Sequence, residues 1–148
     1  MMIIPTGTSR TIYDPARTAV TYDGNSIIDP TLPGDLVLQL AAMSPINNAL
    51  VISNLGKSGQ TIRQMITTRT DVLAAFVPGR RNILIAFEIT NSIFNGASRT
   101  GLQAIDDLAE YIVSVQADVA AAYPGQKWTV IVQTAIDRKS TRLNSSHP

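Results

Sequence analysis

A serine lies in a tight turn directly after a short apolar run near the start of the chain. Ser26 follows Asp23-Gly24-Asn25, and residues 18–22 before it alternate between apolar and polar types. A strand that ends in a glycine-containing turn lifts the turn side chain above the sheet edge and directs nearby backbone N–H groups toward a ligand. Ser26 is therefore a candidate nucleophile, and the alternative is an ordinary Gly-Asn turn without catalysis.

Two further polar loops follow apolar runs. Residues 54–61, which contain Gly56 and Gly59, follow the run 49–52, and residues 88–92 follow the run 82–87. The carboxyl ends of parallel strands meet at one edge of an open sheet, so we expect the three loops to converge on one crevice. The two glycines lack the Gly-Lys-Ser/Thr ending of a P-loop and the third glycine of a dinucleotide site, which argues against phosphate binding.

In order and spacing, these loops resemble the sequence blocks of the SGNH (GDSL-type) hydrolases, a family of esterases and lipases. Gly24-Asn25-Ser26 stands where the family usually has Gly-Asp-Ser, Gly59 stands at the glycine of the second block, and Asn91 stands at the asparagine of the third. The resemblance implies that Ser26 is the nucleophile. It also implies an oxyanion hole made by the N–H groups of Ser26 and Gly59 and the side-chain amide of Asn91. The third block departs from the family pattern at two of its three named positions.

The base that would activate the serine is absent from this chain. The family supplies it from an Asp-x-x-His segment near the C-terminus. The single histidine here is His147, and Asn144 stands where the aspartate would be. Residues 137–148 resemble translated sequencing-adapter DNA, a pattern typical of metagenome-derived reading frames. We therefore expect an irregular lead-in over 1–17, the N-terminal part of an SGNH hydrolase-like domain over 18–136, and a non-native tail over 137–148.

Composition excludes several classes of partner. Three of the 12 basic and one of the 11 acidic residues lie in the tail, so the remaining charges nearly balance and form no basic stripe for nucleic acid. No apolar run is as long as a membrane span, and the start of the chain lacks the features of a signal peptide. The absence of cysteine excludes disulfides and thiolate metal sites, and it leaves the compartment open.

The elements alternate as a parallel sheet requires. We expect strands at about 19–22, 49–53, 83–87 and 128–133, with the last one covered on both faces. We expect helices over 33–43, from about 59, over 71–76, and after a capping box formed by Thr100 and Gln103. The long last helix has an apolar stripe at Leu102, Ile105, Ala109, Ile112, Gln116 and Val119. The predicted fold class is α/β, a flavodoxin-like three-layer α/β/α sandwich with a mostly parallel sheet, incomplete at the C-terminus.

Other acidic residues have alternative interpretations. Asp106, Asp107 and Glu110 have the spacing of a solvated helix face, and no second ligand set accompanies them to hold a metal. Glu88 is expected either to orient Asn91 or approach the substrate, or to be a solvated rim residue. Asp23 is expected to cap the following helix or to hydrogen-bond the turn.

The resemblance therefore implies a serine hydrolase of acyl or acetyl esters, with a small-molecule or carbohydrate ester as substrate and without a cofactor or metal. Without the Asp-x-x-His base, this truncated chain is expected to have low activity. The alternative is a non-catalytic carbohydrate-binding or phage or surface structural domain on the same fold. The sequence does not indicate the oligomeric state.

Overall fold

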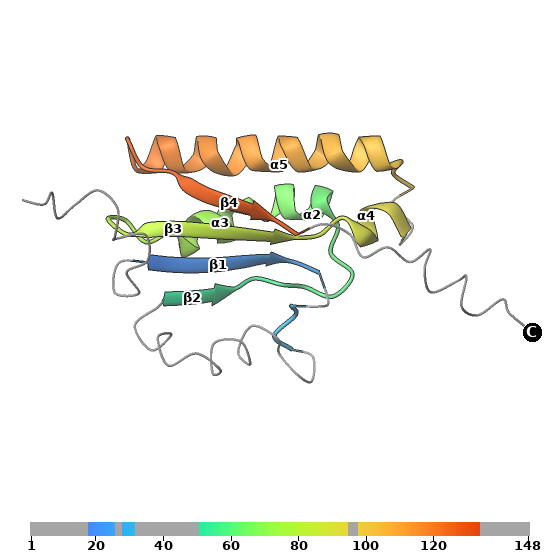
Figure 1. Ribbon diagram of the computed structural model, residues 1–148, viewed down its shortest axis with the longest axis horizontal. Helices are drawn as coiled ribbons and strands as arrows, with labels where there is room; N and C mark the ends of the chain where they lie inside the picture. Colours follow the sequence, from blue (N-terminus) through green and yellow to red (C-terminus); the bar gives the residue numbers. More distant parts are fainter. Residues whose placement is uncertain (1–17, 26–27, 32–50, 95–97, 134–148) are drawn as a thin grey trace, which may run out of the picture.

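The computed structural model describes residues 18–25, 28–31, 51–94 and 98–133. Their strands and helices, drawn in Figure 1, are β1 (Thr18–Gly24), β2 (Val51–Asn54), α2 (Ile62–Thr67), α3 (Arg69–Ala75), β3 (Arg81–Phe87), α4 (Thr90–Phe94), α5 (Gly101–Ala122) and β4 (Trp128–Val132). All four expected strands form. The expected helix at 33–43, the lead-in and the tail lie outside the described residues.

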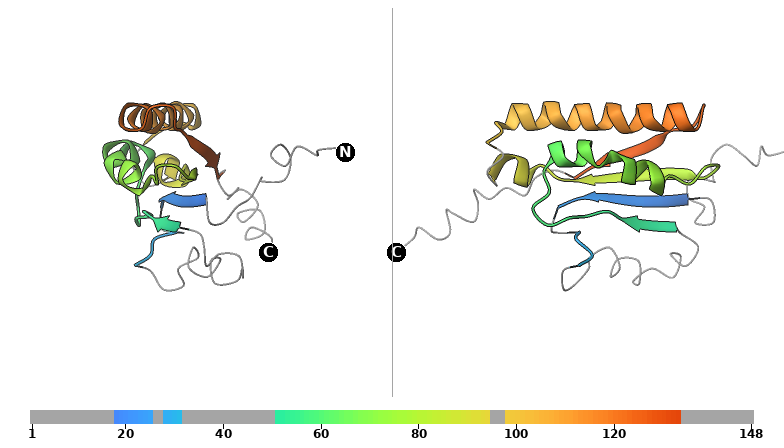
Figure 2. Two further views of the ribbon diagram at one scale, coloured as in Figure 1. Left: turned by 90° about the vertical axis from the view of Figure 1, so that its left-hand side faces the viewer. Right: turned by 180° about the vertical axis from the view of Figure 1, so that it is seen from behind.

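The four strands form one parallel sheet in the order β2-β1-β3-β4. The connections from β2 to β3 and from β3 to β4 move in the same direction across the sheet. Crossovers of one hand then place their helices on the same face. Figures 1 and 2 show this arrangement, with α2, α3 and α5 together on one side of the strands. The described part is thus an α/β fold with a parallel sheet, as predicted.

A hydrophobic core fills the space between these helices and the sheet. The expected inner face of α2, formed by Ile62, Met65 and Ile66, is buried as predicted. The other core residues come from α3, the sheet, α5 and the segment after α3: Val72, Phe76, Leu84, Ala86, Tyr111, Val115, Val119 and Trp128. Burying apolar surface on this scale provides the main stabilisation of the fold.

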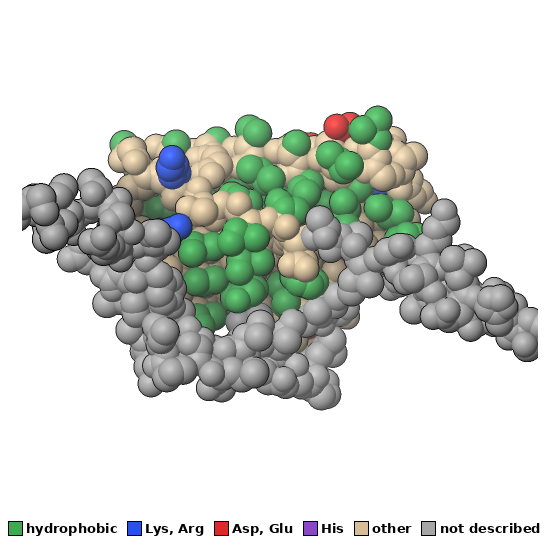
Figure 3. Space-filling model, in the orientation of Figure 1, with side chains coloured by type: hydrophobic (Ala, Val, Ile, Leu, Met, Phe, Trp, Pro, Cys, Tyr) green, Lys and Arg blue, Asp and Glu red, His purple; other side chains and the backbone are tan. Residues whose placement is uncertain are grey.

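The opposite face of the sheet is apolar as well. Along β3, fully buried residues alternate with half-buried ones, so Ile83 and Ile85 point away from the helices that cover Leu84. The strand register places Val20 beside Ile83 and Tyr22 beside Ile85. Figure 3 shows hydrophobic side chains gathered over the strands on this side of the molecule. Hydrophobic residues on both faces are typical of a parallel sheet that is covered on both sides.

The inner face of α5 differs from the predicted stripe. The capping box of Thr100 and Gln103 is present, but Leu102 and Ile105 are 71% and 55% exposed. Of the predicted stripe, only Val119 is among the buried residues, which are Ala104, Asp107, Tyr111, Val115 and Val119. The apolar spacing misses this face because two of its members are polar side chains that find hydrogen-bond partners inside the protein.

Asp107 is one of these two members, and the expectation that it lies on a solvated face is wrong. Its side chain is almost completely buried, and the guanidinium group of Arg99 donates to both carboxylate oxygens over 2.8 and 2.6 Å. The neighbouring Asp106 and Glu110 are exposed, as expected. A bidentate arginine supplies the fixed donors that a buried carboxylate requires.

The expectation that the last strand is covered on both faces is also wrong for the described residues. In β4, Ile131 and Val132 are exposed. The physical reason is position: within the described part of the chain, β4 lies at the edge of the sheet and pairs with β3 alone. A run of apolar β-branched residues does not distinguish an edge strand from a central one.

Candidate active site

The first loop packs directly against the end of the neighbouring strand. The Asn25 N–H donates to the Phe87 carbonyl over 3.2 Å, and a side chain at Gly24 would overlap with that same carbonyl group. Only glycine therefore allows β1 and β3 to approach at this point. Ser26 lies outside the described residues, between Asn25 and Ile28, whose N–H donates to the Asn25 carbonyl over 3.2 Å.

The second loop continues the pairing between β2 and β1. The N–H groups of Leu55 and Lys57 donate to the carbonyls of Tyr22 and Gly24 over 2.8 and 2.9 Å. Gly59 then adopts a left-handed backbone conformation, with φ at 73°, in an exposed part of the loop. Thr61 begins α2 with a capping box, so the loop is held at both ends.

Asp29 anchors this second loop, a role that the sequence analysis missed. Its carboxylate accepts from the backbone N–H of Ser58 over 2.6 Å, and from the N–H and hydroxyl of Thr31 over 2.9 and 2.6 Å. Hydrogen bonds from Thr31 and Ser58 lower the pKa of Asp29. The local bond to Thr31 is typical of an Asx turn, so Asp29-Pro30-Thr31 carried a signal for that bond but none for the partner in the second loop.

The third loop passes into the short helix α4, which contains Asn91. Asn91 is buried, and its side-chain nitrogen donates to the Gln60 carbonyl over 3.0 Å. Gln60 directly follows Gly59 in the second loop. The structure therefore brings two of the three predicted site residues, Gly59 and Asn91, to neighbouring loops at the same edge of the sheet.

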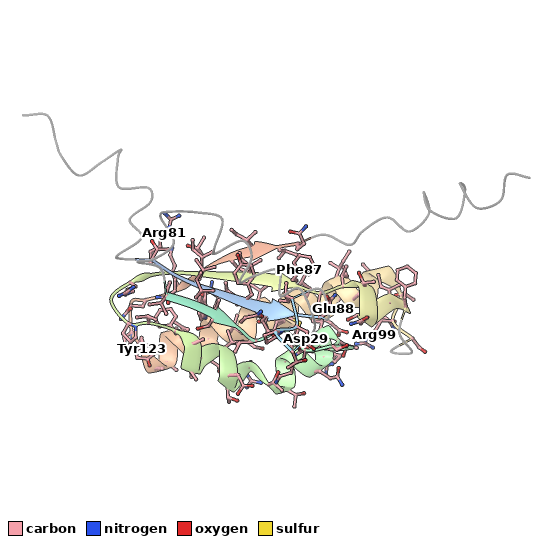
Figure 4. All side chains as sticks on the ribbon, turned by 90° about the horizontal axis from the view of Figure 1, so that it is seen from below. Asp29, Arg81, Phe87, Glu88, Arg99 and Tyr123 are labelled. Carbon is pink, nitrogen blue, oxygen red and sulfur yellow. The ribbon has the colours of Figure 1, made fainter. Side chains whose placement is uncertain are left out.

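Glu88 connects the first and third loops with the start of α2, and of its two expected roles that of a solvated rim residue is wrong. It is 2% exposed, and the side-chain amide of Asn25 donates to its Oε2 over 2.6 Å. Its Oε1 accepts from the N–H and hydroxyl of Ser92 over 2.8 and 3.3 Å. The Ser92 hydroxyl in turn accepts from the N–H of Ile62, at the start of α2, over 3.0 Å. Figure 4 shows Glu88 and Asp29 at the end of the sheet to which the strands point, and Arg81 and Tyr123 at the other end.

Asp23 lies beneath this edge, on the face of β1 that meets α5. Its carboxylate accepts from the Tyr111 hydroxyl over 2.7 Å. Burial raises the pKa of Asp23 to about 6, although the hydrogen bonds from Tyr111 and from the backbone of Gly24 and the charge of Lys57 act in the opposite direction. Burial and the neighbouring Asp23 raise the pKa of Tyr111. The bond from Tyr111 ties the end of β1 to the long helix.

A cavity of about 330 Å³ opens beside Gly59. Its walls come from the second loop, α2 and the residue that follows α2, and they are formed by Lys57, Ser58, Gly59, Gln60, Gln64, Thr67 and Thr68. Amide, hydroxyl and ammonium groups in this lining can take part in hydrogen bonds, while apolar atoms form the larger share of the surface that the cavity exposes.

The described residues contain no group of three or more His, Cys, Asp or Glu side chains that could hold a metal ion. Among the same residues, no helix has both the length and the apolar character needed to cross a membrane.

Comparison with known proteins finds similarity in structure. No model of a protein family matches the chain, and no curated protein sequence matches it. A member of the lipolytic protein G-D-S-L family from Veillonella parvula superposes with a TM-score of 0.53 at 21% identity, over 78% of this chain and 57% of that one. The protein YxiM of Bacillus subtilis superposes with a TM-score of 0.58 at 15% identity, over 80% of this chain and 33% of that one.

The chain thus spans between a third and three fifths of the length of these two proteins. The chain has the α/β fold of the G-D-S-L lipolytic proteins.

Proposed function

We propose that this chain is part of a serine ester hydrolase in which Ser26 is the nucleophile. In this proposal the Ser26 hydroxyl attacks the ester carbonyl. The negative charge of the tetrahedral intermediate is then held by the N–H groups of Ser26 and Gly59 and by the side-chain amide of Asn91. The substrate class is an acyl or acetyl ester.

The observation that carries the proposal is the convergence of the three loops at one sheet edge. Asn91 is one of the predicted site residues, and Asn25 directly precedes another, Ser26. The side chain of each asparagine donates a hydrogen bond to a residue of a different loop. Pre-organised donors are what an oxyanion hole requires, because they then need no rearrangement when charge develops. The shared fold with a G-D-S-L lipolytic protein supports the same interpretation.

The cavity beside Gly59 is the proposed site for the alcohol portion of the ester. Its amide, hydroxyl and ammonium groups can bind the hydroxyls of a carbohydrate or similar polyol, and its apolar surface can contact the carbon skeleton of that group.

The proposal is tested by adding the missing base. Without Asp-x-x-His, the chain should hydrolyse p-nitrophenyl acetate slowly, because removing triad members costs about 10⁴ to 10⁶ in kcat. Fusing a C-terminal segment that carries Asp-x-x-His should raise the rate, and Ser26→Ala in the fused protein should abolish the gain.

Two controls make the result decisive. The fused segment with His replaced by Ala should leave the rate low, and circular dichroism should show that every variant is folded. If the folded, fused protein hydrolyses the ester equally fast with and without Ser26→Ala, the nucleophile is assigned wrongly. The non-catalytic carbohydrate-binding domain would then be the better interpretation, and it would be assayed by sugar binding.

A further inference from the structure

We propose that Asn25 and Glu88 form a charge-matched pair that positions the oxyanion hole, with the single negative charge of the pair carried by position 88. The positioning role rests on the proposed function, because that function defines the oxyanion hole. The pairing itself is independent of that function. It assigns Glu88 as a positioning residue and explains why an amide stands at position 25.

The contacts of Glu88 join the first and third loops. One carboxylate oxygen holds the Asn25 amide at 2.6 Å, next to Ser26, and the other holds the backbone and hydroxyl of Ser92, next to Asn91. Through the Ser92 hydroxyl, the same network reaches Ile62 at the start of α2, just beyond Gly59. A displacement of Glu88 would therefore shift the residues beside Ser26 and Asn91 and the start of the helix that follows Gly59.

The partners of Glu88 are neutral. They are an amide, a hydroxyl and a backbone N–H, and in the described part of the chain the ion pairs involve other acidic residues. A buried carboxylate in such surroundings depends on receiving donors from every side. Asn25 provides one of those donors.

Position 25 is where the sequences that this chain resembles usually have aspartate. An aspartate there would place a second carboxylate within hydrogen-bond distance of Glu88. Two carboxylates that share a buried site cannot both ionise at little cost, so one of them would have to take up a proton. The asparagine is therefore the complement of Glu88. Moving the charge from position 88 to position 25 should preserve the pair, whereas placing a charge at both positions should not.

The test is a charge exchange in the full chain. The variants are Asn25→Asp, Glu88→Gln and the double variant, measured by urea unfolding at pH 7.5. Asn25→Asp should lower the folding equilibrium constant about a hundredfold, because it buries two facing carboxylates. The double variant should recover to within about tenfold of the parent. In that variant the new amide at position 88 can still accept from Ser92 through its oxygen, while its nitrogen donates to the new carboxylate at position 25.

The positioning role needs a measurement that a purely structural contact would not change. The side-chain NH₂ resonances of Asn91 should shift in Glu88→Gln, and they should return toward the parent positions in the double variant. Asp118→Asn is the control, because it removes the charge of a carboxylate near the other end of α5, where Arg69 donates to it over 2.8 Å. It should leave the Asn91 resonances unshifted.

Each outcome decides one question. Losses that simply add in the double variant would refute the pair. If Asn25→Asp does not fold, a folded double variant supports the pair and an unfolded one refutes it. Recovery of stability with Asn91 resonances that never moved would refute the positioning role. If both measurements succeed but Ser26→Ala leaves the hydrolysis rate of the fused enzyme unchanged, the proposed function fails and the charge-matched pair stands.

Discussion

Glu88 and Asp107 are both almost completely buried carboxylates, 2% and 3% exposed, and they are stabilised by different kinds of partner. Glu88, at the carboxyl edge of the sheet, is held by an amide, a hydroxyl and a backbone N–H. Asp107, on α5, is held by the bidentate guanidinium group of Arg99, with Arg63 also within 3.5 Å.

The two regions differ in the chain segments that the buried carboxylate holds in place. On α5, two arginines neutralise the charge, and both retain contact with solvent that screens the interaction. At the sheet edge, neutral donors from separate loops take the place of water around one charge, so that the loops are held relative to one another. We infer that the second arrangement positions chain segments more tightly, whereas the first attaches one segment to a helix.

The largest effect is expected when Glu88 is replaced by an apolar residue. Glu88→Leu leaves the donors of Asn25 and Ser92 buried without their acceptor, so the free energy of unfolding should fall by about 4 kcal/mol. Urea denaturation measures the loss. Glu88→Gln, which keeps an acceptor for Ser92, should lose clearly less. Equal losses in the two variants would mean that burial of the side chain matters and its hydrogen bonds do not.

Asp23 combines features of both regions, because it lies under the sheet edge and bonds to Tyr111 of α5. Its folded-state pKa of about 6 lies above the value of 3.8 in the unfolded chain, so ionisation costs more in the folded protein. Its contribution to stability is fully present below about pH 4 and is lost as the pH rises through about 6.

The Asp23→Asn variant should therefore be more stable than the parent at pH 8, by up to about 3 kcal/mol, and nearly unchanged at pH 4. The amide oxygen can still accept from the Tyr111 hydroxyl, so the bond survives. Unfolding free energies across pH 4–8 measure the effect. A variant that is destabilised at pH 8 would show that the charge of Asp23 contributes favourably there.

A smaller effect is expected at the ion pair on α5. Asp107→Asn removes a charge whose arginine partners remain hydrated, and it should reduce the free energy of unfolding by about 1 kcal/mol. Because Arg99 lowers the pKa of Asp107, the stability that the pair provides is present above the unfolded pKa and is lost as the pH falls through the folded one. Titrating stability with sodium chloride should weaken this pair and leave the Glu88 network largely unaffected. The opposite salt dependence would remove the distinction between the two regions.

The smallest effect is expected on the exposed side of α5. Leu102→Gln changes a side chain that is 71% exposed, so the free energy of unfolding should stay within about 0.5 kcal/mol of the parent. Val115→Ala, on the buried side, is the control and should cost about 2 kcal/mol. A larger loss for Leu102→Gln than for Val115→Ala would mean that the apolar stripe predicted from the sequence is the face of α5 that packs on the core.

The strands were predictable because each contains a short apolar or alternating run, and the first three runs are followed by polar or glycine-containing segments. The helix α2 was predictable too, since Ile62, Met65 and Ile66 follow its period without competing signals. The face of α5 was not, because Asp107 and Tyr111 are polar by type and become suitable for burial only through Arg99 and Asp23. Such partners are distant in the sequence, and periodicity carries no information about them.

The same distinction applies to the candidate site. The loop positions of Gly59 and Asn91 follow from local patterns, whereas the network around Glu88 joins residues up to 63 positions apart. A glutamate that follows a strand reads as solvated unless its donors are known. The assignments of Ser26, Gly59 and Asn91 as catalytic groups stay predictions, to be tested by the fused enzyme.

Gly24 is required by the packing of β1 against β3 at this edge and not by the proposed chemistry. Any side chain there would collide with the end of β3, whatever residue follows it in the loop. A relative with another residue in place of Ser26 would therefore still need the glycine. For engineering, Gly24 is consequently the fixed point of the loop, and diversity for new activities belongs in the positions after it.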